Sequence, residues 1–352
     1  MASFCKVYPD APVFTSIYEP ESTLPFFKQI DIRTSFMQHA PGLKKHFKKY
    51  LPFYPQAFQS FDFTAYDVIL TSSSAFGKCV SVPQGTCHIV YCHNPMRFVW
   101  MYNEYIQRES LSPIFKCLLP PIIKYLKEVD LRSNNNVHYF IANSQNVANR
   151  IEKWYQRTSE IIYPPVNLQQ YRLNQTTIKD YFLIVSRLRE YKRIDVAIQA
   201  FNELGLPLKI VGTGSDRKKL ERMAKPNIEF LGFQDDDALM ELYSQCQALI
   251  FPGEEDFGII PLEAQASGRP VIAYRKGGAL ETIINEKTGV FFDKQTSSSL
   301  REGVQRFQRM SFNETEIHKN ALSFDDDIFQ YKIKNFVQSK WAEFQSKRPS
   351  IR

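Results

Sequence analysis

"ALIFPGEEDFGIIPLEAQASGRPVIAY", residues 248–274, contains the pattern that decides the fold. Its apolar start predicts a buried strand that ends at Pro252 and Gly253. Three carboxylates follow at this corner: Glu254, Glu255 and Asp256. A second apolar run then predicts a helix that contains Glu263, followed by another short strand. Strand, helix and strand at this spacing predict a parallel βαβ unit.

The same alternation extends on both sides of this stretch. Further strands are expected at 180–186, 208–212, 228–232 and 289–292, with amphipathic helices between them. Short apolar strands separated by helices require a parallel sheet that is covered on both faces. The second half of the chain is therefore predicted to be an α/β domain.

The first half is less regular, but it contains four candidate strands: 66–72, 87–93, 138–144 and 160–164. The segment 163–180 is rich in Pro, Asn, Gln and Thr and is expected to be a linker. The tail 325–344 predicts a helix with one apolar stripe, formed by Phe329, Ile333, Phe336, Val337 and Trp341. We therefore expect domains at 1–166 and 167–324, with 325–352 as a helix that crosses back to the first domain.

Composition excludes several classes of protein. A hydrophobic content of 43% and a charged content of 23% are typical of a globular protein. No stretch is long and apolar enough for a membrane span, and the first residues do not resemble a signal peptide. Six cysteines without metal-ligand spacing indicate reduced thiols. The net charge of +7 favours an anionic partner.

The acidic corner lies where ligands bind in parallel α/β sheets, beyond the carboxyl ends of the strands. Pro261 suits a first helical turn, so the backbone N–H groups of Phe257, Gly258 and Ile259 are predicted to form an anion site. Carboxylates beside an anion site are reasonable if they accept hydrogen bonds from ligand hydroxyls.

Positive charge for that anion is expected from "SRLREYKR", which follows another strand. There, Arg187 offers a planar fork of donors and Lys192 a compact point charge, both suited to phosphate oxygens. A ligand with hydroxyls at both ends and phosphates in the middle is a nucleotide-sugar.

Several segments resemble retaining glycosyltransferases of family 4, which have the GT-B fold. "EDFGIIPLE" resembles the family's pair of glutamates, and "SRLREYKRID" its diphosphate motif. "IVGTGSDRKKL", "ANSQNVANRI" and "IIYPPVN" resemble its following strand and its interdomain segments. "YCHNPMRFVW" is similar to the subgroup of O-antigen mannosyltransferases, and the resemblance extends over nearly the whole chain.

The resemblance implies two Rossmann-like domains whose parallel sheets face a central cleft, with the acceptor at 1–166 and the nucleotide-sugar at 167–324. It implies that Glu263 binds the ribose and Glu255 the donor hexose. The backbone at Phe257, Gly258 and Ile259 would hold the sugar and diphosphate, and His93 would face the sugar from the other domain. Arg187 and Lys192 would meet the charge of the leaving diphosphate, which deprotonates the acceptor, so no metal is expected.

The implied function is transfer of a hexose, with mannose from GDP-mannose favoured, to a lipid-linked or saccharide acceptor in surface polysaccharide synthesis. No cofactor and no nucleic-acid partner are expected. The expected location is the cytoplasm, with peripheral attachment to the inner face of the membrane as an option.

One departure supports an alternative. Family members open with a strand and a glycine-rich loop before a segment like "YPDAPVF", which here occupies 8–14, so the N-terminal domain is expected to lack its first strand. The alternative function is a catalytically inactive nucleotide-sugar-binding homologue. A nicotinamide-dependent oxidoreductase is disfavoured because no GxGxxG follows the first strand.

The segment 42–58, "GLKKHFKKYLPFYPQAF", has two possible interpretations. On a helix, its lysines at 44, 45, 48 and 49 oppose a face formed by Leu43, Phe47, Tyr50 and Leu51. This is the pattern of a helix on an anionic membrane, and equally that of a core helix with a solvated basic face. Elsewhere, Asp235–Asp237 predicts a helix cap in preference to a metal motif, and "VGTGS" a turn.

Overall fold

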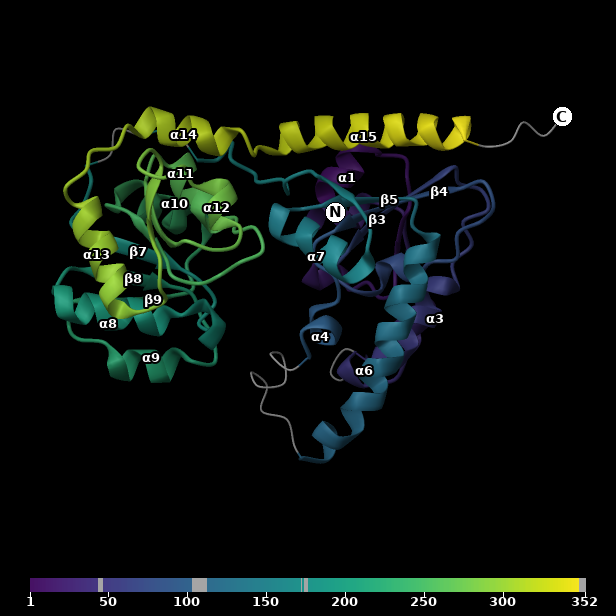
Figure 1. Ribbon diagram of the computed structural model, residues 1–352, viewed down its shortest axis with the longest axis horizontal. Coiled ribbons are helices and arrows are strands. Elements are labelled where there is room, and N and C mark those ends of the chain that lie inside the picture. The colour runs from purple at the N-terminus through teal and green to yellow at the C-terminus, as the bar shows by residue number, and fades with distance from the viewer. Residues whose placement is uncertain (44–46, 103–112, 172, 174–176, 348–352) are drawn as a thin grey trace. The chain divides into compact units, whose positions relative to one another are not determined.

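A computed structural model describes residues 1–352 except 44–46, 103–112, 172, 174–176 and 348–352. The side chains of 47–49 and 113–118 also lie outside the described part. The chain divides into two compact units (Figure 1), one made of Met1–Tyr163 with Phe329–Arg352 and the other of Pro164–Ile328. Each unit contains its own parallel sheet.

The described residues of the first unit form six strands: β1 (Val13–Thr15), β2 (Ile32–Thr34), β3 (Val68–Ser73), β4 (Cys87–Cys92), β5 (Tyr139–Ala142) and β6 (Ser159–Ile161). Its α-helices are α1 (Ala2–Val7), α3 (Tyr54–Gln59), α4 (Arg97–Trp100), α6 (Pro113–Ser133) and α7 (Gln145–Tyr155), and it includes α15 (Asp326–Ser346) from Phe329 onward. Short 3-10 helices are η1 (Pro20–Ser22), η2 (Pro25–Gln29), η3 (Phe36–His39), η4 (Phe47–Phe53), η5 (Phe76–Cys79) and η6 (Asn134–Asn136).

The main sheet of this unit is parallel, in the order β3-β4-β5-β6, so the four strands predicted in the first half are confirmed. Every residue of β4 is buried because helices cover both faces. Its residues Ile89 and Tyr91 pack with α1 and α15, whereas Val90 and Cys92 pack with α7. This alternation is the period of two that a strand imposes.

A small separate sheet pairs β1 with β2 in parallel. Both strands are short, and the sequence pattern did not predict them. Among the described strands, β3 is the end strand of the main sheet and pairs only with β4.

The second unit contains β7 (Phe182–Val185), β8 (Leu208–Val211), β9 (Ile228–Gly232), β10 (Leu249–Phe251), β11 (Val271–Tyr274) and β12 (Gly289–Phe292). Its helices are η7 (Glu190–Lys192), α8 (Ile194–Leu204), α9 (Arg217–Met223), α10 (Asp236–Gln245), α11 (Ile260–Ala266), α12 (Ala279–Thr282), α13 (Ser297–Phe307) and α14 (Glu314–Leu322). All six predicted strands are confirmed.

These strands form one parallel sheet in the order β12-β11-β10-β7-β8-β9. In Figure 1, α8, α9 and α13 lie on one side of this sheet, and α10, α11 and α12 lie on the other. The chain runs outward from β7 to β9, then returns to β10 and runs outward to β12. The order therefore reverses between β7 and β10, which is the switch point where doubly wound sheets bind ligands.

The expectation of one continuous amphipathic helix over 42–58 is wrong for the described residues. η4 and α3 replace it, with Pro52 and Pro55 inside this stretch. Proline removes a backbone donor and clashes with the preceding turn, so a regular α-helix is interrupted. Leu43 packs with Met37 and Ala57, whereas Leu51 packs in a different cluster. These two apolar side chains belong to the interior of the unit, while the side chains of 44–49 lie outside the described residues.

The described cysteines are buried as free thiols: Cys5, Cys79, Cys87, Cys92 and Cys246. Among the helices of the described part, none combines the length and the apolar character required to cross a membrane.

Candidate functional site

Two loops meet at the switch point of the second unit. β7 and β10 are neighbours, with Leu183 opposite Leu249, and both run in the same direction. Their carboxyl ends therefore lead to the same edge of the sheet. The loop after β7 contains Arg187 and Lys192, and the loop after β10 contains Glu255.

Glycines allow these loops to approach their neighbours closely. A Cβ atom on Gly212 would lie 1.9 Å from the carbonyl oxygen of Ser186, and one on Gly214 would lie 2.1 Å from that of Leu188. A Cβ on Gly253 would lie 3.1 Å from the carbonyl oxygen of Lys192. The glycines in "VGTGS" thus let the loop after β8 lie against the loop after β7.

Lys192 and Glu255 form an ion pair and a hydrogen bond across the switch point. Their side chains are only 12% and 25% exposed, so water screens this pair less than it would a surface pair. The pair joins two residues that the sequence assigned to different parts of a ligand. The ammonium of Lys192 also lies 5.3 Å from the ring centroid of Tyr191.

Arg187 precedes Lys192 in the loop after β7 and is exposed. Within the described residues, its guanidinium has no ion pair. A guanidinium in this state can offer its whole fork of donors to an anion.

Glu263 projects from the first turn of α11 and is partly buried. The hydroxyl of Tyr243, a fully buried residue of α10, donates a hydrogen bond of 2.8 Å to Oε2 of Glu263. Burial raises the pKa of Glu263, and the bond from Tyr243 opposes that rise. The ring of Tyr171 packs edge-on to Tyr243 at 6.1 Å. Oε1 of Glu263 has no hydrogen bond from another described residue, so it can accept one from a ligand hydroxyl.

The remaining predicted residues have distinct positions in the loop before α11. Phe257 is 4% exposed and packs against Phe324, so its side chain belongs to the core. Gly258 has a φ of +87°, a conformation that favours glycine. Ile259 is 42% exposed and is the N-cap residue of α11. The proposed anion site on their N–H groups remains a prediction.

Sequence reasoning gave no role at this corner to the loop "RKGGAL", which supports it. The N–H of Gly278 donates a bond of 2.9 Å to the carbonyl oxygen of Glu255. A Cβ on Gly278 would lie 2.0 Å from the carbonyl oxygen of Phe257, so a larger residue would displace the loop. Lys276 pairs with Glu254 at 3.1 Å. The adjacent glycines were the signal that could have identified this support.

Asp235 is confirmed as a helix cap, since its carboxylate accepts a bond of 2.9 Å from the N–H of Ala238. Among the residues that can be described, no group of three or more His, Cys, Asp or Glu side chains could hold a metal ion.

His93 lies in the first unit, directly after β4. Its Nε2 lies 2.8 Å from Oγ of Ser72, and its ring packs edge-on to Tyr91 at 5.2 Å. Burial, and to a smaller extent the charged N-terminus, lower the pKa of His93 to about 4. The imidazole is therefore neutral at pH 7. Its expected contact with a donor sugar remains a prediction.

Comparison with known proteins matches this chain to glycosyltransferases. The family model described as "Glycosyl transferases group 1" matches residues 169–323. O-antigen chain mannosyltransferase C of Escherichia coli is 25% identical over 249 residues, which cover 66% of this chain and 64% of that protein. Alpha-1,3/1,6-mannosyltransferase ALG2 of Mus musculus is 24% identical over 302 residues, which cover 70% of this chain and 68% of that protein.

Other relatives match over less of their length. An uncharacterized glycosyltransferase of Methanocaldococcus jannaschii is 27% identical over 177 residues, or 49% of this chain and 50% of that protein. A second one from the same organism is 34% identical over 35% of this chain and 34% of its own length. The chain thus spans about half the length of the first of these relatives and about a third of the length of the second.

Solved structures match nearly the whole chain. Sucrose-phosphate synthase from Thermosynechococcus elongatus has a TM-score of 0.70 at 18% identity, covering 95% of this chain and 90% of that one. Anabaena HepE, solved in complex with UDP, has a TM-score of 0.67 at 18% identity, covering 96% of each. At these identities the likeness shows the fold, which is GT-B.

Proposed function

We propose that this chain moves a hexose from a nucleotide-sugar to an acceptor. Its residues 169–323 match the family model of the glycosyl transferases group 1. The observation that supports this most is the convergence of Lys192, Glu255 and Arg187 at the switch point of the second unit. Two cations and a carboxylate at one sheet edge suit a ligand that carries a diphosphate beside sugar hydroxyls.

In this proposal the ion pair holds both side chains ready for the donor. Lys192 keeps Glu255 extended across the edge while the site holds no donor. When the diphosphate enters, Lys192 and Arg187 share its negative charge, and Glu255 accepts hydrogen bonds from sugar hydroxyls. Glu263 accepts bonds from the ribose through its open oxygen, while Tyr243 fixes the other one. Both cations belong to the chain, so the proposed reaction requires no metal.

We infer the specific donor and acceptor from the names of the similar proteins. Two of them are named mannosyltransferases, which favours mannose and GDP-mannose. HepE was solved with UDP-glucose, so a uridine donor is the alternative to test. A lipid-linked or saccharide acceptor in surface polysaccharide synthesis is proposed from the O-antigen enzyme's name. We propose cytoplasmic action at the inner membrane face.

The direct test uses donor turnover. The chain is incubated separately with GDP-mannose and UDP-glucose, and the released sugar is followed by NMR before it mutarotates. Both donors carry an α-linked sugar, so a retaining enzyme should release the α-anomer. Release of the β-anomer would contradict retention, and failure of both donors to bind would contradict the proposal itself. Binding without turnover would instead support the inactive homologue.

Glu263→Ala should weaken binding of the nucleotide-sugar by about 10- to 150-fold. This estimate follows because a hydrogen bond to a charged group is worth roughly 1.5–3 kcal/mol. Titration calorimetry with GDP-mannose and with UDP-glucose measures the change. The matched control is Glu254→Ala, since Glu254 pairs with Lys276 and lies in the same corner. Equal affinity of wild type and Glu263→Ala for both donors would contradict the assignment.

The same residue predicts a pH dependence. A carboxylate accepts hydroxyl bonds better than a neutral acid, and burial raises the pKa of Glu263. Protonation, and with it the loss of affinity, should therefore begin at a higher pH than for an exposed glutamate as the solution is acidified. In Glu263→Ala this loss of donor affinity on acidification should be absent.

Membrane attachment rests on the lysines at 44, 45, 48 and 49. Because Leu43 is buried in the unit, attachment is expected to use charge without insertion of that side chain. Replacing the four lysines by Gln should release the protein from anionic vesicles, since each lysine near the surface contributes about 1 kcal/mol. Vesicle sedimentation measures release, and circular dichroism verifies folding.

A control variant, Lys218→Gln with Lys219→Gln, removes exposed charge from α9 in the other unit. High salt should mimic the four-lysine variant because exposed charges are screened beyond about 10 Å at 0.1 M. If the four-lysine variant sediments like the wild type, the segment is not the attachment site.

A further inference from the structure

A fully buried glutamine follows Glu263 in α11. Gln265 is 0% exposed, although glutamine usually lies at the surface. A buried amide needs partners at both of its ends, and this one has them. Its Nε2 donates a bond of 2.9 Å to the carbonyl oxygen of Thr282, and its Oε1 accepts one of 2.6 Å from Nδ2 of Asn320. The partners belong to α12 and α14, so this side chain links three helices of the second unit.

The carbonyl of Thr282 is the point where the three helices meet. α12 contains only Ala279–Thr282, so its last carbonyls have no partner within the helix. The carbonyl oxygen of Thr282 accepts the bond from Gln265 and a second one, of 3.0 Å, from Nδ2 of Asn320. A helix of a single turn is not stable alone, so the position of α12 depends on such contacts.

Thr282 extends these bonds to the acidic corner. Its Oγ1 donates a bond of 3.2 Å to the carbonyl oxygen of Gly278, and the N–H of Gly278 donates one of 2.9 Å to the carbonyl oxygen of Glu255. Thr282 is 0% exposed, so its bonds lie away from water. We name Asn320, Gln265 and Thr282 the three-helix network. It leads by consecutive hydrogen bonds from α14 to the backbone of Glu255.

We propose that the three-helix network sets the spacing between Glu255 and Glu263, and with it the fit of the sugar part of the donor. Glu263 is carried by α11, and the backbone of Glu255 is bound to the residue before α12, so the spacing depends on how α11 and α12 are joined. The inference rests on the proposed function, in which Glu263 meets the ribose and Glu255 the hexose. The members of the network are positioning residues, because they act through the two glutamates.

α14 also provides a matched control. Nδ1 of His318 lies 2.6 Å from the carbonyl oxygen of Ala266, so His318 joins α14 to α11 as Asn320 does. Both side chains are partly buried. Within the described part of the chain, His318 has no hydrogen bond to α12. Loss of α14 docking can therefore be separated from loss of the link between α11 and α12.

The first measurement compares a nucleotide with its sugar conjugate. Asn320→Leu and His318→Phe each keep a similar shape and remove the hydrogen bonds of the side chain. Titration calorimetry on the full chain gives the Kd values of GDP, GDP-mannose, UDP and UDP-glucose. In Asn320→Leu, affinity for the nucleotide-sugar should fall about 2- to 30-fold relative to affinity for the nucleotide, the size typical of changes within a coupling network. In His318→Phe this affinity ratio should equal that of the wild type.

The ratio distinguishes positioning from general support of the fold. The nucleotide reaches only one of the two glutamates, so a changed spacing affects it little. Thr282→Val removes Oγ1 with little change of shape and should lower the same ratio. If the bonds act in series, the double variant with Asn320→Leu should be no worse than the stronger single variant, whereas independent sites would add.

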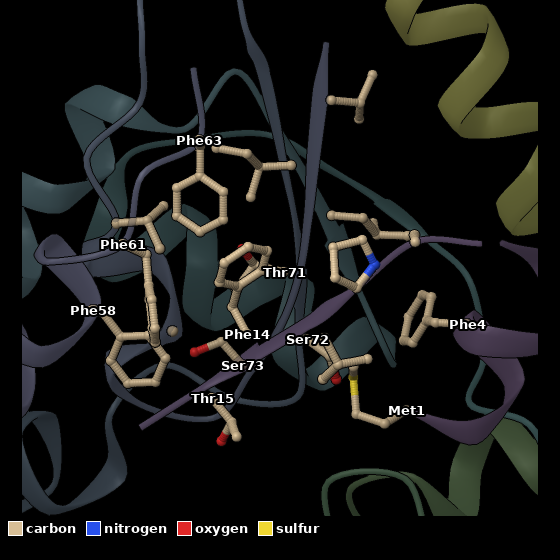
Figure 2. Close-up of a pocket in the computed structure, with 18 of the residues that line it drawn as sticks. Met1, Phe4, Phe14, Thr15, Phe58, Phe61, Phe63, Thr71, Ser72 and Ser73 are labelled. Carbon is tan, nitrogen blue, oxygen red and sulfur yellow. The ribbon is translucent and has the colours of Figure 1, made fainter. Parts of the chain in front are cut away.

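Hydrogen exchange tests the network without a donor. In Asn320→Leu the amide of Gly278 should exchange faster, because its bond to the carbonyl of Glu255 opens more often. In His318→Phe it should exchange at the wild-type rate. Mass spectrometry measures the peptides that contain these groups. Strand β3 is the internal reference, since Thr71 and Ser72 line an apolar pocket of the first unit (Figure 2) and should exchange equally in every variant.

Three results would overturn the inference: an unchanged affinity ratio in Asn320→Leu, an equal fall in His318→Phe, or additive losses in the double variant. If the wild type binds no nucleotide-sugar, the proposed function fails on its own. Exchange then decides the network, which is supported by faster exchange of Gly278 in Asn320→Leu alone and overturned by equal exchange. If Asn320→Leu does not fold, Thr282→Val carries the same two measurements.

Discussion

Lys192→Ala should slow sugar transfer by roughly 10²–10³-fold, the effect typical of a lost preorganised charge at a reacting centre. The leaving diphosphate gains negative charge only as the glycosidic bond breaks. Loss of the ammonium therefore destabilises mainly the transition state, so turnover should fall more than donor affinity. Single-turnover release of GDP from GDP-mannose, or of UDP from UDP-glucose, measures the change.

The control for general charge loss is Lys219→Ala, an exposed lysine of α9, which should turn over at the wild-type rate. Lys192→Arg should recover part of the activity, because it restores the charge with a different geometry. A variant Lys192→Ala that binds the donor weakly but turns it over at the wild-type rate would contradict the transition-state role.

Asp130→Ala should destabilise the first unit by roughly 3–5 kcal/mol, as expected when one partner of a buried ion pair is removed. Nζ of Lys78 lies 3.0 Å from Oδ1 of Asp130, and both side chains are at most 4% exposed. Oδ2 of Asp130 accepts a bond of 2.7 Å from Trp100 Nε1 and one of 2.8 Å from the Tyr155 hydroxyl. Alanine would leave the buried ammonium of Lys78 and the two donors, Trp100 and Tyr155, without this partner.

Urea unfolding followed by tryptophan fluorescence measures the loss. Asp31→Ala is the matched control, because Asp31 pairs with Arg33 at 2.9 Å on the surface. That change should alter the free energy of unfolding by less than about 1 kcal/mol. A similar small change in Asp130→Ala would mean that water reaches Lys78 and replaces the lost carboxylate.

The sequence predicted the second unit well because each strand there is a short apolar run bounded by a loop. Lys192 and Glu255 are separated by 63 positions, yet each follows a strand of the same parallel sheet. That topology was enough to predict a shared edge. The ion pair itself, and the bond from Tyr243 to Glu263, depend on side-chain positions that no spacing in the sequence reveals.

The first unit was harder to predict for physical reasons. Lys78 and Asp130 are ordinary surface residue types, and only the fold shows that they are buried together. β1 and β2 contain three residues each, too few to show a period of two. In 42–58 the apolar spacing favoured a long helix, but Pro52 and Pro55 interrupt it.

The buried cysteines allow the opening of each unit to be measured separately. Cys246 lies in the second unit, and burial raises the pKa of its thiol to about 12. Cys79 lies in the first, with a pKa raised by burial to about 11. A thiol in this state reacts with iodoacetamide only when its surroundings open. In a variant that retains only one of these cysteines, the labelling rate measures how often the surrounding unit opens. The opening rates of the two units can therefore be compared, and they need not be equal.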